Sequence, residues 1–495
     1  MYKVTLLLGI LACAFVPIGC HNKPAVTTAE TTCTDSLQAK IEAAPWGGTV
    51  IANDCIYRET VTVDKPLTLK ASSGTEIRGS DVWKEWSKSG SYWTSQDTLP
   101  SFSASGQCVT GTSRCVWPEQ VFFDGKPLTQ VASEPESWQF AVDSSRNILL
   151  ADDPSEHTVE VTTRTEWVEG GSSDVIIEGF TMKHAANDAQ NGALYNNGYS
   201  NWTVQNNTLA DAHALNVKLD YGTDLKFLGN DVSRAGQLGV GGYGGAKVEL
   251  HNNYIHHNNT EDFEFGWEAG GVKLAGSQDL VADSNTVYEN NGHGLWCDGG
   301  CKDATIINNR LHHNANSAIF YEISDNAEIY GNTLWENGWE ARRGSWMASV
   351  RSVNSRNVEI HHNVVAWNYG NIAVVATDRG DSYYNDIHDN YVHDNTVLAE
   401  DFSSSEPLDS GHRSHALAWL GPLMDPAKKN SAANNRYWYS TPEDSIPRFY
   451  YDERGIIELT DFNATQGEEQ GRYLTDAEKD KIVSSAKIPA SPEER

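Results

Sequence analysis

Basic residues are scarce in this sequence. Its 495 residues include 37 lysines and arginines against 67 aspartates and glutamates, and the formal net charge at pH 7 is −30. This balance excludes nucleic acid and anionic membrane surfaces as partners that bind through charge. An acidic surface is typical of soluble extracellular proteins, but it does not specify a reaction.

Long apolar runs are also lacking. The N-terminal run from Val4 to Ile18 is shorter than the roughly 20 residues that a membrane-spanning helix needs. The run ends in Pro17-Ile18-Gly19-Cys20, which resembles a bacterial lipoprotein processing site, with Cys13 as an alternative site. We therefore predict a signal peptide over residues 1–19, a lipidated Cys20 and a polar tether over residues 20–32.

The predicted signal places the protein outside the cytoplasm. We expect an exported chain, lipid-anchored at the bacterial envelope, whether in the outer membrane, the periplasm or at the cell surface. The membrane is then a partner only through the lipid anchor.

Cysteines are few, at eight in the chain. The six beyond Cys20 pair most simply in sequence order, as Cys33 with Cys55, Cys108 with Cys115, and Cys297 with Cys301. An even number of cysteines in an exported protein indicates disulfides. Metal binding would require more than two ligands within reach, and no pair has a neighbouring pair in the sequence. We predict three disulfides and no cofactor, and leave calcium open as an alternative.

The N-terminal part of the mature chain predicts a cap for a larger structure. Residues 35–44 have helical spacing with Asp35 as the expected N-cap. Residues 49–51, 60–63 and 67–69 predict short strands separated by turns. We assign residues 33–80 to an N-terminal capping helix and the first coils of a solenoid.

A less regular segment follows over residues 81–170, rich in Trp, Ser and Gly. Residues 119–128 predict a hairpin with Asp124-Gly125 at its turn, and residues 147–150 and 158–161 predict further strands. We interpret this segment as a small β-rich insertion.

A repeat of about 23 residues begins near residue 171 and predicts the fold. Asparagines recur at positions 207, 230, 253, 285, 309, 332, 363 and 390, with an apolar residue three positions before and two positions after each. Apolar side chains can stack inside a narrow tube while Asn stabilises each bend. We predict an all-β, right-handed parallel β-helix over residues 171–440, followed by a C-terminal cap and tail over residues 441–495.

Two coils of this repeat are unusually long, at 32 and 31 residues. Their extra residues form loops at 258–271 and 337–347, on either side of the coils that carry Asp298 and Glu322. Long loops on one face of a solenoid commonly build its binding site.

Asp298 and Glu322 are the candidate catalytic pair. Residues 291–298 and 315–322 are similar alternating segments, each ending in an acid, and the acids are 24 residues apart (322 − 298). Equivalent positions on adjacent coils lie about 4.8 Å apart, so the two carboxyl groups should be neighbours. Two such groups cannot both ionise freely, which leaves one acid and one carboxylate, as retaining glycoside cleavage requires. The alternative is a ladder of solvated surface acids.

Further side chains surround the predicted pair. Aromatic candidates for sugar contact are Trp267, Trp296, Phe320 and Trp346, and charged candidates are Glu268, Lys273 and Arg351. Each charged group is equally explained as a surface charge. The pairs His256-His257 and His312-His313, with Glu289 between them, have the composition of a zinc site, but we interpret them as stacked turn residues.

The segments Gly266–Lys273, Gly294–Asp298 and Ile319–Ser324 together resemble right-handed parallel β-helix glycosidases, above all the β-xylosidases of glycoside hydrolase family 120. The resemblance covers residues 174–392. It implies Asp298 as nucleophile, Glu322 as acid/base one coil later, and Glu268 as a further catalytic acid. Cys297 and Cys301 depart from that family's pattern.

The sequence thus predicts a retaining glycoside hydrolase that acts on an extracellular oligo- or polysaccharide, with β-xylosidase-like activity as one form. The second hypothesis is a polysaccharide lyase, in which Lys273 and Arg351 would serve β-elimination on a uronate, with calcium held by Glu268. The third is a surface solenoid that binds carbohydrate without turnover.

Overall fold

The computed structural model describes residues 31–339, 347–380, 385–399, 415–440, 447–452, 454–465 and 467–492. Residues Thr32–Arg495 form one compact unit, separate from Met1–Thr31. The predicted signal peptide, Cys20 and nearly all of the tether lie outside the described residues, as do Trp346 and most of the loop at 337–347. Among the described residues, no helix is both long and apolar enough to span a membrane.

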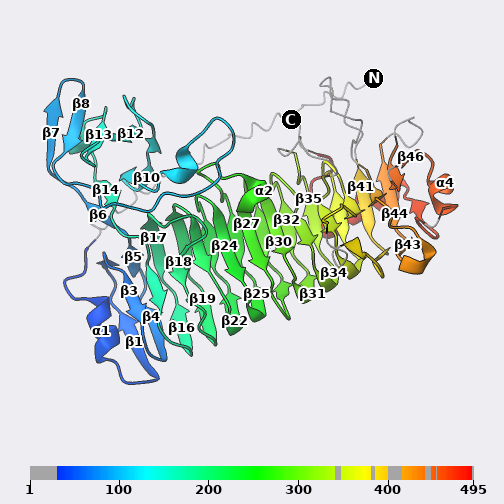
Figure 1. Ribbon diagram of the computed structural model, residues 1–495, viewed down its shortest axis with the longest axis horizontal. Coiled ribbons are helices and arrows are strands. Elements are labelled where there is room, and N and C mark those ends of the chain that lie inside the picture. Colours follow the sequence, from blue (N-terminus) through cyan, green and yellow to red (C-terminus); the bar gives the residue numbers. More distant parts are fainter. Residues whose placement is uncertain are drawn as a thin grey trace, which may run out of the picture. The chain divides into compact units, whose positions relative to one another are not determined.

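Within the described ranges, most strands of this unit stack into three long sheets of 12, 13 and 13 strands, and each complete coil adds one strand to every sheet (Figure 1). The first sheet contains β1 (Gly48–Ala52), β4 (Leu67–Ala71), β16 (Val175–Glu178), β19 (Trp202–Gln205), β22 (Thr223–Leu228), β25 (Ala246–His251), β28 (Val281–Asp283), β31 (Lys302–Ile307), β34 (Asp325–Tyr330), β37 (Arg356–His361), β40 (Tyr391–His393) and β43 (Ser431–Ala433). The second contains β3 (Val61–Val63), β15 (Val168–Gly170), β18 (Gly192–Tyr195), β21 (Leu215–Lys218), β24 (Leu238–Tyr243), β27 (Gly270–Ala275), β30 (His293–Asp298), β33 (Ile319–Glu322), β36 (Val350–Val353), β39 (Ile372–Val375), β42 (Leu417–Leu420), β45 (Phe449–Tyr451) and β46 (Arg454–Ile456). The third contains β2 (Ile56–Tyr57), β5 (Glu76–Arg78), β17 (Thr181–Ala185), β20 (Thr208–Ala212), β23 (Asp231–Ser233), β26 (Tyr254–His256), β29 (Thr286–Tyr288), β32 (Arg310–His312), β35 (Thr333–Trp335), β38 (Val364–Ala366), β41 (Thr396–Ala399), β44 (Arg436–Tyr439) and β47 (Arg472–Tyr473).

Neighbouring strands in these sheets are parallel, except that β46 folds back antiparallel on β45. The alternation of apolar and polar residues turns one side of every strand inward. These inward side chains form a continuous apolar core that begins with the N-terminal helix and extends to Phe462. The all-β parallel helix predicted from the repeat is therefore confirmed.

The N-terminal helix α1 (Leu37–Ala43) covers the first coil and buries Leu37 and Ile41. Its N-cap is Ser36, whose hydroxyl accepts from the Ala39 amide, so the predicted cap at Asp35 is wrong by one residue. Asp35 instead contacts Lys40 Nζ at 2.8 Å.

Asparagine side chains form ladders at the bends. From Asn207 to Asn435, each Asn Nδ2 donates to the Asn Oδ1 of the next coil at 2.9–3.1 Å. The prediction that Asn390 belongs to this ladder is wrong, because Asn363 donates to Asn395, whereas Asn390 pairs with Asn430. Ile387, Val392 and Val397 are five residues apart, so both asparagines have the same apolar flanks.

A second ladder, which the sequence analysis missed, follows the third sheet. It joins Asn258, Asn290, Asn314, Asn337 and Asn368 with the same donor and acceptor geometry at 2.8–3.0 Å. The two ladders fix the register of successive coils and hence the alignment of side chains on the second sheet.

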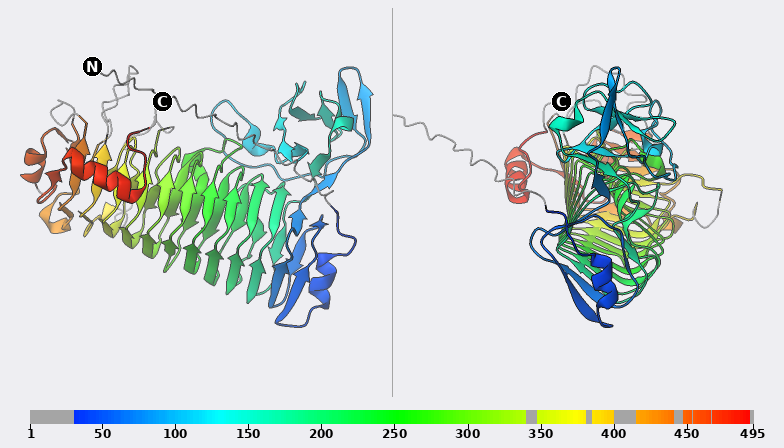
Figure 2. Two further views of the ribbon diagram at one scale, coloured as in Figure 1. Left: turned by 180° about the vertical axis from the view of Figure 1, so that it is seen from behind. Right: turned by 90° about the vertical axis from the view of Figure 1, so that its left-hand side faces the viewer.

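The insertion consists of two small sheets beside the first coils (Figures 1 and 2). One contains β6 (Ser80–Val82), β9 (Val121–Phe123), β10 (Lys126–Pro127) and β14 (Val159–Thr162), and the other β7 (Trp86–Ser89), β8 (Tyr92–Ser95), β11 (Thr129–Gln130), β12 (Gln139–Val142) and β13 (Ile148–Leu150). The predicted hairpin forms with Asp124 and Gly125 both at positive φ. The insertion ends before β15, which belongs to the solenoid, so the expected boundary at residue 170 lies too late.

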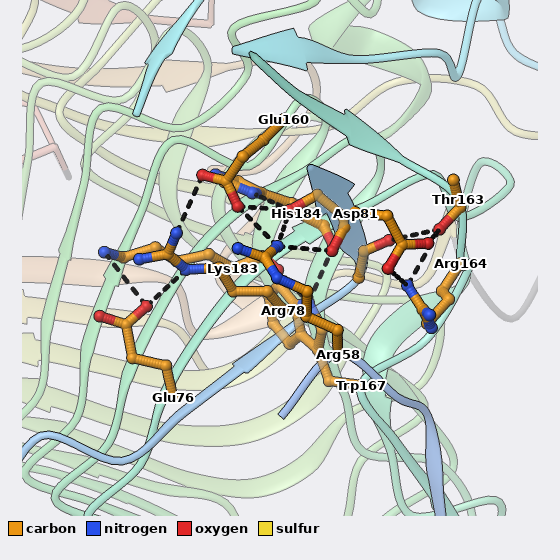
Figure 3. A network of polar contacts seen from close by, with 12 residues as sticks. Arg58, Glu76, Arg78, Asp81, Glu160, Thr163, Arg164, Trp167, Lys183 and His184 are labelled. Atoms are coloured by element: carbon orange, nitrogen blue, oxygen red, sulfur yellow. Dashed lines mark hydrogen bonds and ion pairs between the residues drawn. The ribbon is translucent and has the colours of Figure 1, made fainter. Parts of the chain in front are cut away.

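A buried polar network joins the insertion to the solenoid (Figure 3). Glu160 on β14 is 2% exposed and accepts from Arg58 Nη1 at 2.7 Å and from Arg78 Nη1 at 2.9 Å. Ser80 Oγ lies 3.1 Å from Glu160 and 2.7 Å from His184 Nδ1. Burial raises the pKa of Glu160, but the charge that His184 carries once protonated and the two guanidinium groups outweigh it and lower that pKa to about 2.

At the other end, helix α5 (Asp476–Ala486) begins with a capping box at Thr475 and Glu478. Its residue Val483 packs with Trp335 and Trp367 on the outer side of the third sheet. Figure 2 shows this helix, in red, lying across the later coils.

Candidate active site

The candidate site lies on the outer side of the second sheet, where four coils align their side chains. Lys273, Trp296, Phe320 and Arg351 are consecutive partners on β27, β30, β33 and β36. Leu295 and Cys297 face the core, as the alternation predicts. Two residues after Trp296, Asp298 is the last residue of β30. Two residues after Phe320, Glu322 is the last residue of β33.

Lys273 organises the first half of the site. Its Nζ lies 3.0 Å from Glu268 Oε1 and 3.0 Å from Asp298 Oδ2, and its side chain is almost buried. The ammonium also lies 3.8 Å from the centre of the Trp296 ring. Glu268 reaches this point from the short helix α2 (Phe265–Glu268), which immediately precedes β27. The Lys273 charge therefore compensates the charge of Asp298.

Glu322 has a different environment from Asp298. It is 9% exposed, and burial together with the nearby charge of Asp298 raises its pKa above the usual range. Arg379 forms an ion pair with Glu322 and opposes this rise without cancelling it. The two acids thus differ in environment, because Glu322 is buried with a raised pKa, whereas Asp298 lies beside the Lys273 ammonium.

The aromatic residues that precede the two acids on β30 and β33, Trp296 and Phe320, are stacked and buried. The rings of Trp296 and Phe320 lie 5.2 Å apart and nearly parallel, and the guanidinium of Arg351 lies 3.9 Å from the centre of the Phe320 ring. His293 packs on both rings, and burial lowers its pKa well below the usual value. Burial likewise lowers the pKa of Arg351 to about 10. Because both rings are buried, this stack offers no open ring face to a sugar.

Not every predicted residue joins the cluster. Trp267 stacks on Phe263 at 6.2 Å and packs against a cluster whose buried members include Cys115 from the insertion. The structure thus brings together Glu268, Lys273, Trp296, Asp298, Phe320, Glu322 and Arg351, while Trp267 contacts the insertion loop. Arg379 was missed by the sequence analysis, because it lies 57 residues from Glu322 in a loop outside the repeat.

A cavity of about 170 Å³ lies beside Lys273 toward the earlier coils. Its walls include Lys218, Asp220, Tyr243, Glu268 and Lys273. Gly241 pairs with Lys218 on one side and Lys273 on the other, and the Leu215 side chain occupies the space that a Cβ on Gly241 would take.

The three disulfides form between the predicted partners. Cys297–Cys301 closes the turn directly after Asp298, where Gly299 and Gly300 adopt positive φ. Cys108–Cys115 holds the insertion loop near α2, and Cys115 O lies 3.1 Å from His213 Nε2. Both bridges therefore fix backbone beside the candidate site.

Each predicted histidine pair stands at a strand end, with His256 and His312 the last residues of β26 and β32, so the prediction that both members are turn residues holds only for His257 and His313. Nδ1 atoms of neighbouring histidines lie 2.7 Å apart in His256-His257 and 2.8 Å apart in His312-His313, and the same contact recurs in a third pair at 361–362. In the described residues, groups able to hold a metal occur elsewhere, as His362 with His393 and Asp394, and as Glu328 with Glu359 and His361. These groups lie on the first sheet and do not include Glu268.

Comparison with known proteins agrees with this architecture. A family model described as "Right handed beta helix region" matches residues 191–365, which include both candidate acids. No curated protein matches the sequence. The solved complex of XylC with xylose superposes with a TM-score of 0.65 at 14% identity, covering 88% of this chain and 82% of that chain.

Two further solved structures align over the same share of this chain, but less closely. The mannuronan C-5 epimerase AlgE4 A-module of Azotobacter vinelandii gives a TM-score of 0.45 at 11% identity, over 94% of its length. A DFA-IIIase mutant of Arthrobacter chlorophenolicus A6 in complex with DFA-III gives 0.40 at 12%, over 92% of its length. The XylC match and the family model identify the fold as a right-handed parallel β-helix.

Proposed function

We propose that this protein is a retaining glycoside hydrolase that acts on an extracellular oligo- or polysaccharide. The observation that carries the proposal is the adjacent Asp298 and Glu322 in unlike environments, one beside the Lys273 ammonium and the other buried with a raised pKa. Adjacent coils lie about 4.8 Å apart. The carboxyl separation of retaining enzymes is about 5–5.5 Å, whereas inverting enzymes need about 6.5–9.5 Å.

In the first step, a carboxylate oxygen of Asp298 attacks the anomeric carbon, and the bond to the leaving oxygen breaks. Glu322 gives its proton to that oxygen, and the sugar remains as an ester on Asp298. In the second step, the Glu322 carboxylate takes a proton from water, the water oxygen attacks the anomeric carbon, and Asp298 departs as a carboxylate. The product keeps the anomeric configuration of the substrate.

Neighbouring residues support this division of roles. Lys273 compensates the charge of Asp298 and holds Glu268 beside the cavity, where both can bind sugar hydroxyls. The stacked Trp296 and Phe320 fix the positions of the strands that end in the two acids. XylC, which shares the fold, was solved with xylose, so β-xylosides are the first substrates to test.

The lyase alternative receives less support. Elimination on a uronate would need a cation free to neutralise the substrate carboxylate, but two carboxylates already flank the Lys273 ammonium. An unsaturated, UV-absorbing product from a uronate polymer would nevertheless establish that reaction.

The test is a panel of aryl glycosides, β-xyloside included, assayed with the wild type, Asp298→Asn and Glu322→Gln. We expect both variants to lose about 10²–10⁴-fold in kcat/KM on substrates that need protonation. Asp303→Asn, an exposed acid on β31, is the matched control and should keep full activity. Hydrolysis that survives both site substitutions would rule out the assignment.

We also propose that the chain is exported and lipid-anchored through Cys20. The three disulfides support export, because they persist in oxidising compartments. Mass spectrometry of the mature N-terminal peptide tests the anchor: a diacylglyceryl group on Cys20 is expected, and an unmodified Cys20 in the mature protein would exclude it.

A further inference from the structure

Three tyrosines protrude from successive coils next to the cavity. Tyr199 follows β18, Tyr221 follows β21, and Tyr243 is the last residue of β24. Their side chains are 38%, 65% and 52% exposed, respectively. Single exposed aromatic residues are ordinary, but here Tyr221 and Tyr243 are in ring contact and Tyr199 is exposed on the coil before them.

The local backbone places these rings rather than leaving them free. The rings of Tyr221 and Tyr243 lie 5.4 Å apart in an edge-to-face arrangement. A Cβ on Gly244 would lie 3.0 Å from Tyr221 Cδ1, so the Tyr221 ring covers this glycine. The Tyr221 amide also donates to Tyr243 O at 2.7 Å. Because Gly244 has no side chain, the Tyr221 ring has room to lie against the next coil.

The tyrosine surface is continuous with the cavity. Tyr243 belongs to both, and its amide donates to Asp220 Oδ1 at 2.8 Å. Asp220 Oδ2 accepts from Lys218 Nζ at 3.0 Å and from Tyr195 Oη at 3.2 Å. A ligand that extends from the cavity toward the earlier coils would pass from hydrogen-bonding groups onto aromatic rings.

The charges of the cavity indicate a neutral ligand. Lys218 is paired with Asp220, and Lys273 with Glu268 and Asp298, so the cations are already compensated. The chain as a whole carries a net charge of −30, which disfavours an acidic polymer. Tyrosine offers an apolar face and a polar edge, which match the C–H face and the hydroxyl rim of a sugar ring.

We propose that Tyr243, Tyr221 and Tyr199 form a binding platform for a neutral polysaccharide chain that extends from the cavity toward the earlier coils. The direction in which the polysaccharide runs, away from the candidate active site, rests on the proposed function. The binding itself requires no turnover. The substrate would then be a polymer or a long oligosaccharide held at several sugar units.

Affinity electrophoresis tests the platform, using the Asp298→Asn protein so that no polymer is digested. Native gels would contain soluble arabinoxylan, mixed-linkage β-glucan or, as the acidic comparison, polygalacturonate. We expect retardation by at least one neutral polymer, and about tenfold weaker retention after Tyr221→Ala or Tyr243→Ala. Tyr221→Phe, which keeps the ring, should retain most of the binding and guards against a folding defect.

Tyr254→Ala is the matched control, because Tyr254 is 55% exposed but lies on β26 of another sheet. It should migrate as the parent does. Retardation by neither neutral polymer, stronger retardation by polygalacturonate, or equal retention in the Tyr221→Ala and Tyr254→Ala proteins would each overturn the inference. Aryl-glycoside hydrolysis by the wild type is measured separately, and its failure would count only against the proposed hydrolase activity.

Discussion

The substitution Glu160→Gln should destabilise the packing of the insertion against the solenoid, and the expected loss of free energy can be worked out from the structure. Glu160 is 2% exposed and accepts from both Arg58 and Arg78. Its pKa falls from 4.5 to about 2 on folding, and at 1.36 kcal/mol per pKa unit this shift is worth about 3 kcal/mol. Removing one partner of a buried ion pair costs about 3–5 kcal/mol, which gives a similar figure.

This contribution depends on pH in a defined direction. Because the folded-state pKa of Glu160 is depressed, its contribution is fully present above pH 4.5 and is lost as the pH falls toward about 2. Burial lowers the pKa of His184 to about 4, so the unfolded chain takes up that proton first as the pH falls below 6.5. The insertion should therefore loosen in acid in two stages.

Hydrogen–deuterium exchange of β14, residues Val159–Thr162, measures the effect at pH 7. A loss of about 3 kcal/mol should speed exchange there by about 100-fold, while strands of the central coils keep their wild-type rates. Glu178→Gln is the control, because Glu178 forms a partly exposed ion pair with Lys70 that should be worth at most about 1 kcal/mol. Exchange in β14 of Glu160→Gln within fivefold of wild type would refute the reasoning.

Further predictions concern the candidate site and the C-terminal end of the ladder. Glu322→Ala should keep much of its first-step rate on aryl glycosides with very good leaving groups, and azide should speed turnover to a glycosyl azide of unchanged configuration. Asp298→Ala should show neither effect, and rescue of Asp298→Ala alone would exchange the two roles. Arg379→Gln should move the basic limb of the kcat/KM profile to higher pH, because Arg379 lowers the pKa of Glu322; an unmoved limb would separate Arg379 from the acid. Glu468, which accepts from Asn435 at the end of the ladder, has a pKa raised from 4.5 to about 7 by burial, so its contribution to folding stability is fully present below pH 4.5 and is lost as the pH rises through about 7. Glu468→Gln should therefore raise the melting temperature at pH 8 but not at pH 4, and equal shifts at both pH values would contradict this.

The repeat made the solenoid predictable because one geometric rule applies to every coil. Each bend needs Asn and each inward position needs an apolar residue, so a single sequence shows the period many times. The error at Asn390 came from the same source: Ile387, Val392 and Val397 satisfy the rule in two registers, and only the pairing of Asn363 with Asn395 decides between them.

The candidate site was predictable where it follows the repeat and unpredictable elsewhere. Asp298, Glu322, Lys273 and Arg351 occupy equivalent or adjacent positions on β30, β33, β27 and β36, so their alignment follows from the period. Arg379 reaches Glu322 from a loop that has no fixed register. The burial of Trp296 and Phe320 depends on side chains from later coils, which the repeat alone does not place.

The pairing of Glu322 with Val353 on the next coil has a consequence for how this scaffold selects a reaction. Distances along the sheet come in steps of one strand, about 4.8 Å, so the gap between two catalytic acids has discrete values. One step corresponds to the retaining geometry, and two steps, about 9.6 Å, fall near the upper end of the range for inverting enzymes. Moving the acid from 322 to 353 would leave room for a water between the carboxyl groups. On a β-helix, the stereochemical outcome can therefore be encoded by which coil carries the acid, with no change in backbone shape.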